Sequence, residues 1–165
     1  MALSLLDSEK QHFAELLVAI QGCVYFLDAS SRKLTWPLGK EHLEIHKKDI
    51  ALFKAIAAIN ERFAKLQDTL GAAMRHACLL LSETTDNFLK VLSFYEKTNV
   101  LESVATWQLC RTARNLAAQD YDIDYTNIAD HFNTLQSLFP MLYMTAVRFL
   151  NSLCLSKQTA LWNLC

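Results

Sequence analysis

The scarcity of turn-forming residues constrains this chain more than any other feature, because it has three glycines and two prolines among 165 residues. A β-sheet protein needs a turn roughly every 8–12 residues, and tight turns rely on such residues. The plentiful Ala and Leu residues favour helix, since they lose little conformational freedom there. The sequence therefore predicts an all-α fold. A chain of this length can bury a sizeable core, so we expect a single domain over residues 1–165.

Apolar residues at three- and four-residue spacing predict an up-and-down bundle of about five helices. The first helix is expected to begin near Asp7, and Pro37 and Gly39 mark a connection over residues 34–39. A second helical region follows over residues 41–82, long enough for two helices or for one rod spanning the bundle.

The remaining three helices are shorter or interrupted. The third is expected over residues 86–97, and the fourth begins after Ser103 as its N-cap and ends near Asp120. The fifth begins near Asn127, and Pro140 is expected to bend it or divide it in two.

Charge, apolar runs and cysteine content limit the partners and the cellular compartment that are expected for this chain. The formal charge of −1 provides no overall attraction to nucleic acid or to an acidic membrane, so any RNA contact requires a local cluster of cations. The apolar runs are short and broken by charges, and the N-terminus lacks the pattern of a secretory signal, so no membrane span is expected. Five scattered cysteines without a C-x-x-C pair indicate reduced thiols. We expect a cytoplasmic protein without a metal or other cofactor.

The stretch RTARNLAAQDY, residues 111–121, carries the densest chemistry. It places four residues on one face of the fourth helix, at i, i+3, i+4 and i+7: Arg111, Arg114, Asn115 and Ala118. The two guanidinium groups suit bidentate binding of a phosphate. They equally suit ion pairs with carboxylates of the long second region, such as Asp68 or Glu61. Because ion pairs are common and phosphate sites rare, the pattern alone favours the structural interpretation.

The same stretch resembles the signature of HEPN-domain proteins of the HepT type, the toxins of MNT–HEPN toxin–antitoxin pairs. That signature is R-x-x-x-x-H-x-Y, and here Arg114, Gln119 and Tyr121 stand at its three defining positions. Two further segments are similar to the family: ERFAKLQDTLG, residues 61–71, and LESVATWQLCRTARN, residues 101–115. The resemblance covers roughly residues 59–150. It implies a HEPN-like helical bundle that forms a homodimer, with the motifs of two subunits meeting in a cleft.

The resemblance also implies an activity, metal-independent endoribonuclease cleavage of RNA. Arg114 would then stabilise the charge that builds on the phosphorane, with Arg111, Asn115 and Asp120 beside it. Gln119 would occupy the acid/base position, where the family has a histidine that moves protons near neutral pH.

Gln119 is the departure from the family pattern, because a carboxamide does not titrate and cannot relay a proton. General acid–base catalysis contributes about 10²–10⁴-fold, so activity is expected to be weakened or lost. Gln119 is either the native residue of a member with altered activity or a replacement that silences a toxic protein. The alternative function is a catalytically silent helical module that docks a partner nucleotidyltransferase.

Tyr121 stands where the family tyrosine accepts AMP groups from the partner, an MNT-type nucleotidyltransferase antitoxin. Without the resemblance, an ordinary half-buried tyrosine would be the preferred interpretation. His42 and His46 are spaced i, i+4, but a third ligand is lacking, so a surface pair is favoured over a metal site. His131 follows the motif and is expected near the cleft.

Overall fold

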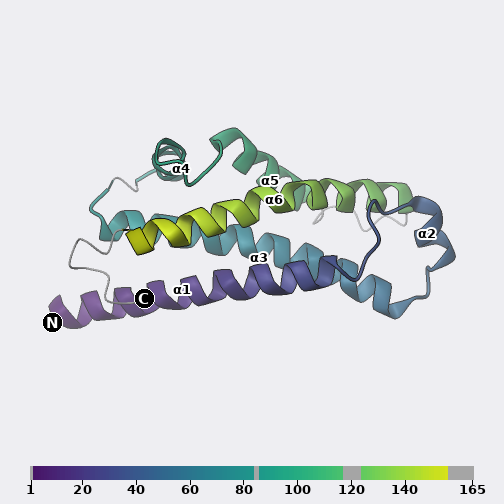
Figure 1. Cartoon of the computed structure of the whole chain (residues 1–165), viewed down its shortest axis with the longest axis horizontal. Helices are drawn as coiled ribbons and strands as arrows, with labels where there is room; N and C mark the ends of the chain where they lie inside the picture. The colour runs from purple at the N-terminus through teal and green to yellow at the C-terminus, as the bar shows by residue number, and fades with distance from the viewer. Residues whose placement is uncertain (1, 84–85, 117–123, 156–165) are drawn as a thin grey trace.

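The computed structural model describes residues 2–83, 86–116 and 124–155. Within these ranges all regular structure is helical: α1 (Ala2–Ser31), α2 (Lys40–Ile45), α3 (Ile50–Leu80), α4 (Phe88–Lys97), α5 (Val104–Leu116) and α6 (Tyr125–Leu155). Along the chain α1, α3, α5 and α6 alternate in direction, so two of the long helices, α3 and α6, run the same way (Figure 1). The predicted all-α, up-and-down bundle is therefore confirmed, with six described helices instead of about five.

Helix α3 is the central element, because it packs against α1, α4, α5 and α6. Helix α1 packs on α3 and α6, whereas α5 packs on α3, α4 and α6. Consequently α1 and α5 lie on different sides of the α3–α6 pair (Figure 1).

The first half of the chain differs from the expected helix boundaries. Helix α1 already begins at Ala2, before the cap expected near Asp7. The expected region over residues 41–82 is divided into α2 and α3, and Asp49 is the reason. Its carboxylate accepts a hydrogen bond from the Leu52 amide at 3.1 Å, which caps α3 and fixes where it starts.

The caps of the second half lie close to their expected positions. The Asn87 side chain accepts a hydrogen bond from the Leu89 amide at 2.8 Å and caps α4. Ser103 Oγ accepts one from the Thr106 amide at 3.0 Å, which confirms the predicted N-cap of α5. Asp124 binds the Thr126 amide in the same way, so α6 begins at Tyr125 rather than Asn127. Pro140 lies inside α6 without dividing it.

The core is built mainly from the three long helices. Its largest fully buried side chains include Phe13 and Leu27 of α1, Phe63 and Met74 of α3, and Phe149 of α6. Three of the five cysteines, Cys23, Cys78 and Cys110, are buried as free thiols, as expected of core packing residues.

Helix α1 is more apolar than expected. Over Asp7–Ser31 it is long and apolar enough to cross a membrane by length and composition, the one such segment among the described residues. The expectation that charges break every apolar run is therefore wrong for this helix. Core helices of soluble proteins pass the same test, and the inner side of α1 is part of the core through Phe13, Ile20 and Leu27.

Candidate functional site

Helix α5 carries the described part of the predicted site. Its apolar side, with Trp107, Cys110 and Ala113, is buried against the bundle. The opposite side exposes Arg111 and Asn115. Because the buried positions recur every three residues, they fix the rotation of α5 and leave the polar side toward solvent.

Arg114 lies at the boundary of these two sides, with 26% of its side chain exposed. Its Nη1 atom donates to Oδ1 of Asp68 on α3, and the two form an ion pair. Of the two carboxylates proposed from the sequence, Asp68 is the partner. The ion pair that the structural interpretation predicts for Arg114 is therefore present. A guanidinium has five N–H donors, so one such bond leaves others able to bind a phosphate.

The LQDTLG segment of α3, residues 66–71, holds α5 at two further points. Gln67 is 3% exposed, and its Nε2 atom donates to the backbone oxygen of Trp107 at 3.1 Å. Gly71 is the second point, because a Cβ atom there would lie 3.2 Å from Cζ of Phe88 and 3.5 Å from Cζ2 of Trp107. The glycine gives α4 and α5 room to approach α3 closely.

The structure brings together three of the predicted site residues, Arg111, Arg114 and Asn115, because all three lie on α5. Gln119, Asp120 and Tyr121 lie outside the described residues, as do Ala118 and the predicted end of the helix. Their roles remain predictions.

Gln67 is a functional contact that sequence reasoning missed. Gln67 lies at helical spacing from three apolar residues, Phe63, Leu70 and Met74. This spacing marks it as a polar residue on the buried face of α3. A buried amide needs hydrogen-bond partners. Its buried position is therefore the sequence signal that Gln67 holds another part of the chain through a hydrogen bond. Its Oε1 atom has no hydrogen-bond partner among the described residues.

Burial shifts the pKa of two further groups, Cys110 on α5 and His131 on α6. Burial raises the pKa of the Cys110 thiol to about 12, so it stays protonated at neutral pH and is a packing residue, not a nucleophile. Burial also lowers the pKa of His131 on α6, which disfavours its charged form. Its Nε2 atom has no hydrogen-bond partner among the described residues.

The remaining histidines are surface or packing residues. The rings of His42 and His46 lie 4.3 Å apart between centroids, and His46 Nδ1 lies 2.9 Å from the His42 backbone oxygen. No group of three potential metal ligands occurs in the described ranges. His76 stacks on Phe13 and contacts Glu9, with 3.2 Å between Nε2 and Oε2, so it has the partner that the sequence did not reveal.

No known family model, curated protein or solved structure matches this chain.

Proposed function

We propose that this chain is a HepT-like HEPN protein whose α5 surface binds RNA phosphates through Arg111 and Arg114. In this proposal its metal-independent endoribonuclease activity is weakened or absent, because Gln119 occupies the acid/base position. The supporting observation is that two segments resembling the family contact each other. Asp68 of LQDTLG pairs with Arg114, and Gln67 of the same segment binds the backbone of Trp107.

These contacts give Arg114 a defined position. Asp68 restrains the guanidinium on one side, and a preorganised cation stabilises developing negative charge better than a mobile one. The pair is partly exposed, with 61% of the Asp68 side chain accessible, so a phosphate can approach the remaining donors of Arg114. Arg111 is exposed one helical turn earlier and extends the same cationic surface.

The remaining parts of the proposal come from the family resemblance. The chain acts in the cytoplasm as a homodimer, with the α5 surfaces of two subunits lining one cleft. An MNT-type nucleotidyltransferase antitoxin adds AMP groups to Tyr121. The added phosphate and base then occupy the place of the RNA substrate, and like-charge repulsion opposes binding of its backbone.

Restoring the titratable group tests the enzyme directly. Purified Gln119→His is expected to cleave RNA in the presence of EDTA, with a rate about 10²–10⁴-fold above the unchanged chain. Adding Arg114→Ala should abolish this cleavage, whereas adding Arg148→Ala, an exposed arginine of α6, should not. A folded Gln119→His protein without cleavage would overturn the ribonuclease proposal.

The second candidate function is the catalytically silent module that docks a nucleotidyltransferase. The observation that favours it is the non-titrating Gln119, together with a protonated Cys110. It predicts that the unchanged chain binds the nucleotidyltransferase encoded beside it, and that Gln119→His remains inactive on RNA. Intact-mass spectrometry after incubation with that partner and ATP also tests Tyr121, because AMP addition should disappear in Tyr121→Phe.

A further inference from the structure

The outward side of α1 carries an apolar patch that the other described helices leave largely exposed. At its edge the Arg62 guanidinium of α3 lies over the Phe26 ring, 5.2 Å from the ring centroid. The residues of the patch recur at spacings of four, three and four: Val18, Gly22, Tyr25 and Ala29, with Phe26 beside them. Val18 and Tyr25 are each 69% exposed, and Phe26 is 50% exposed. We call these five residues the α1 patch. Isolated apolar residues on a surface are ordinary, but a contiguous row along one helix is typical of an interface.

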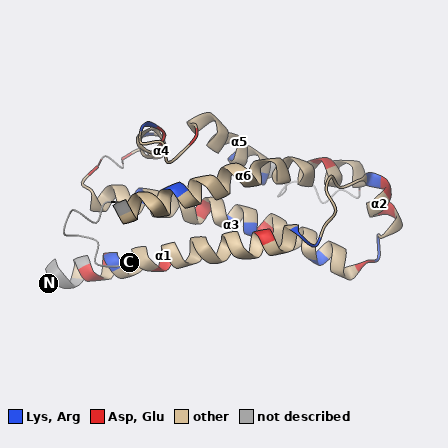
Figure 2. Ribbon diagram, viewed as in Figure 1, with Lys and Arg blue, Asp and Glu red and all other residues tan. Residues whose placement is uncertain are grey.

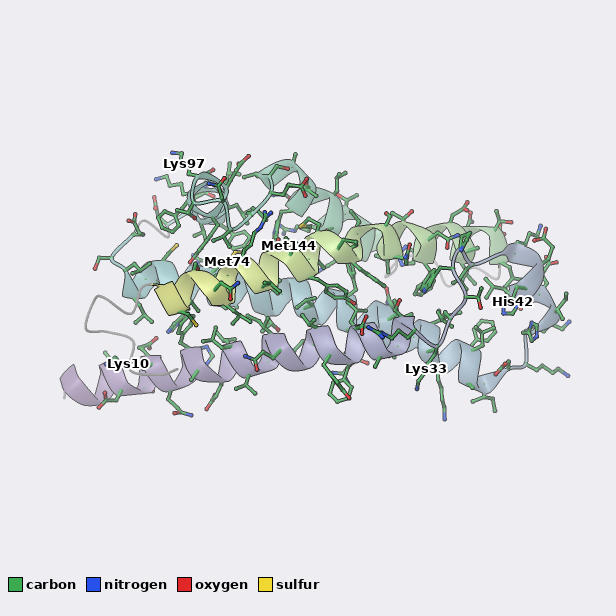
Figure 3. All side chains as sticks on the ribbon, in the orientation of Figure 1. Lys10, Lys33, His42, Met74, Lys97 and Met144 are labelled. Atoms are coloured by element: carbon green, nitrogen blue, oxygen red, sulfur yellow. The ribbon has the colours of Figure 1, made fainter. Side chains whose placement is uncertain are left out.

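Charged residues flank the α1 patch with a net charge of opposite sign at its two ends. Asp7 and Glu15 are exposed before it, and Arg32 and Lys33 are exposed after it. The acidic end also holds Lys10, and the basic end also holds Asp28, which pairs with Arg32 at 2.8 Å. The sequence between Glu15 and Asp28 carries no formal charge. Figure 2 shows the same arrangement, with an uncharged middle of α1 between charges near its ends. In Figure 3, Lys33 marks the end of α1 that follows the patch.

We propose that the α1 patch binds a second copy of this chain, with the two α1 helices antiparallel across a two-fold axis. In a two-fold contact the same patch meets itself, so it must be self-complementary. An antiparallel pairing meets that requirement, because the acidic end of each helix faces the basic end of the other. A parallel pairing would instead place like charges opposite each other, which is unfavourable.

The positions of the charges and of Gly22 along α1 indicate where the two-fold axis crosses the helix. With the axis at the level of Val24, Glu15 of one copy lies opposite Lys33 of the other, and Gly22 lies opposite Phe26. Nothing among the described residues lies within 4 Å of a Cβ built on Gly22, so this position is open to a large side chain. An aromatic ring of one copy then packs over the glycine of the other, as small residues permit close approach of two helices.

A lipid surface is the other occupant to consider, because α1 is apolar enough to enter one. The charges of α1 argue against it, since Asp7 and Glu15 on the outward side would face anionic headgroups. The inner side of α1 is also committed to the core through Ile20 and Leu27, both fully buried. A second protein copy satisfies both the apolar patch and its flanking charges.

This interface is separate from the α5 surface and does not rest on the proposed function. The two lie on different sides of the α3–α6 pair, so pairing through α1 neither covers Arg111 nor requires it. A chain that pairs through both surfaces forms an assembly larger than a dimer.

Sedimentation equilibrium of the full chain tests the proposal through charge reversal. Glu15→Lys and Lys33→Glu are each expected to raise the dissociation constant about tenfold, because each places like charges opposite one another in both halves of the interface. The double variant should return it to within about threefold of the unchanged chain, since the pairs are then reversed rather than lost. Leu89→Lys, an exposed apolar position on α4, adds a charge away from the interface and should have no effect.

A second variant tests the apolar part without relying on charge pairs. Val18→Lys with Tyr25→Lys should halve the mass of the assembly while leaving the helical circular dichroism unchanged, because both side chains are exposed in the single copy. The proposal is overturned if the unchanged chain is monomeric at about 100 μM, a weak limit for a specific dimer. It is also overturned if the double charge variant is not rescued. Flotation with anionic vesicles by a monomeric chain would assign the α1 patch to a lipid surface instead.

Discussion

The two sides of α3 are held by different kinds of contact. On one side α3 meets α1 along most of its length, mainly through aliphatic and aromatic side chains that are almost fully buried. On the other side it meets α4 and α5 over a shorter stretch, where buried apolar side chains such as Trp107 are joined by polar contacts. These are the Gln67 amide, the ion pair between Asp68 and Arg114, and a hydrogen bond from the Tyr95 hydroxyl to the Met74 backbone oxygen at 3.2 Å. Apolar burial is strong and non-directional, whereas the polar contacts fix position and contribute little energy. The α1 side therefore supplies more of the stability, and the polar contacts of the other side orient the candidate site.

The α1 side should give the largest loss of stability. Phe13 is 1% exposed, stacks on His76 of α3 and meets the ring of Phe149 on α6 edge to face. Phe13→Ala is expected to lower the free energy of unfolding by about 3–5 kcal/mol, because it removes a buried ring and leaves a cavity. Urea denaturation followed by circular dichroism measures this change.

The matched control is Val18→Ala on the same helix, since Val18 is mostly exposed. It should change the free energy of unfolding by no more than about 0.5 kcal/mol at a concentration where the chain is monomeric. If both substitutions had equal effects, α1 would not be held to α3 by its buried side.

Substitutions at the two helical glycines should change the free energy of unfolding by intermediate amounts and in opposite directions. Gly71→Leu should lower the free energy of unfolding by about 1–3 kcal/mol, because its side chain would displace Phe88 and Trp107. Gly22→Ala, where the added Cβ meets open space among the described residues, should raise it by about 0.5–1 kcal/mol through helix propensity.

Thermal unfolding of both glycine variants at low protein concentration provides the comparison. A loss of stability in Gly22→Ala would contradict the open space beside that glycine on α1. No loss in Gly71→Leu would contradict the close packing assigned to the α5 side of α3. Tryptophan fluorescence adds a local measurement, because Trp107 is in contact with Gly71 but remote from Gly22.

Local sequence signals predicted most of the fold. The near absence of Gly and Pro determined its class, and short polar residues such as Ser103 marked helix starts correctly. The sequence left residues 41–82 open as two helices or one rod, and the hydrogen bond from the Leu52 amide to the Asp49 carboxylate shows where the second of these helices, α3, starts. Helix α1 begins earlier than expected, at Ala2 rather than near Asp7.

The candidate site was predictable only in part. Spacing placed Arg111, Arg114 and Asn115 on α5, but their partner on α3 was left as a choice between Asp68 and Glu61. That choice depends on how α3 and α5 are rotated against each other, which is set by buried contacts such as Gln67 with Trp107. Local periodicity marks Gln67 as a buried polar residue, but it does not identify the partner of Gln67 on another helix.

The ion pair between Asp68 and Arg114 should give the smallest effect. A double-mutant cycle with Asp68→Asn and Arg114→Gln is expected to give a coupling energy of about 0.2–1 kcal/mol, because the carboxylate is largely exposed and solvent screens the pair. Urea denaturation of the four proteins at low salt measures it. A coupling above roughly 2 kcal/mol would indicate a buried structural clamp instead. A weak coupling means that little free energy opposes exchange of Asp68 for another anion, and this is the property that a phosphate-binding arginine on α5 requires.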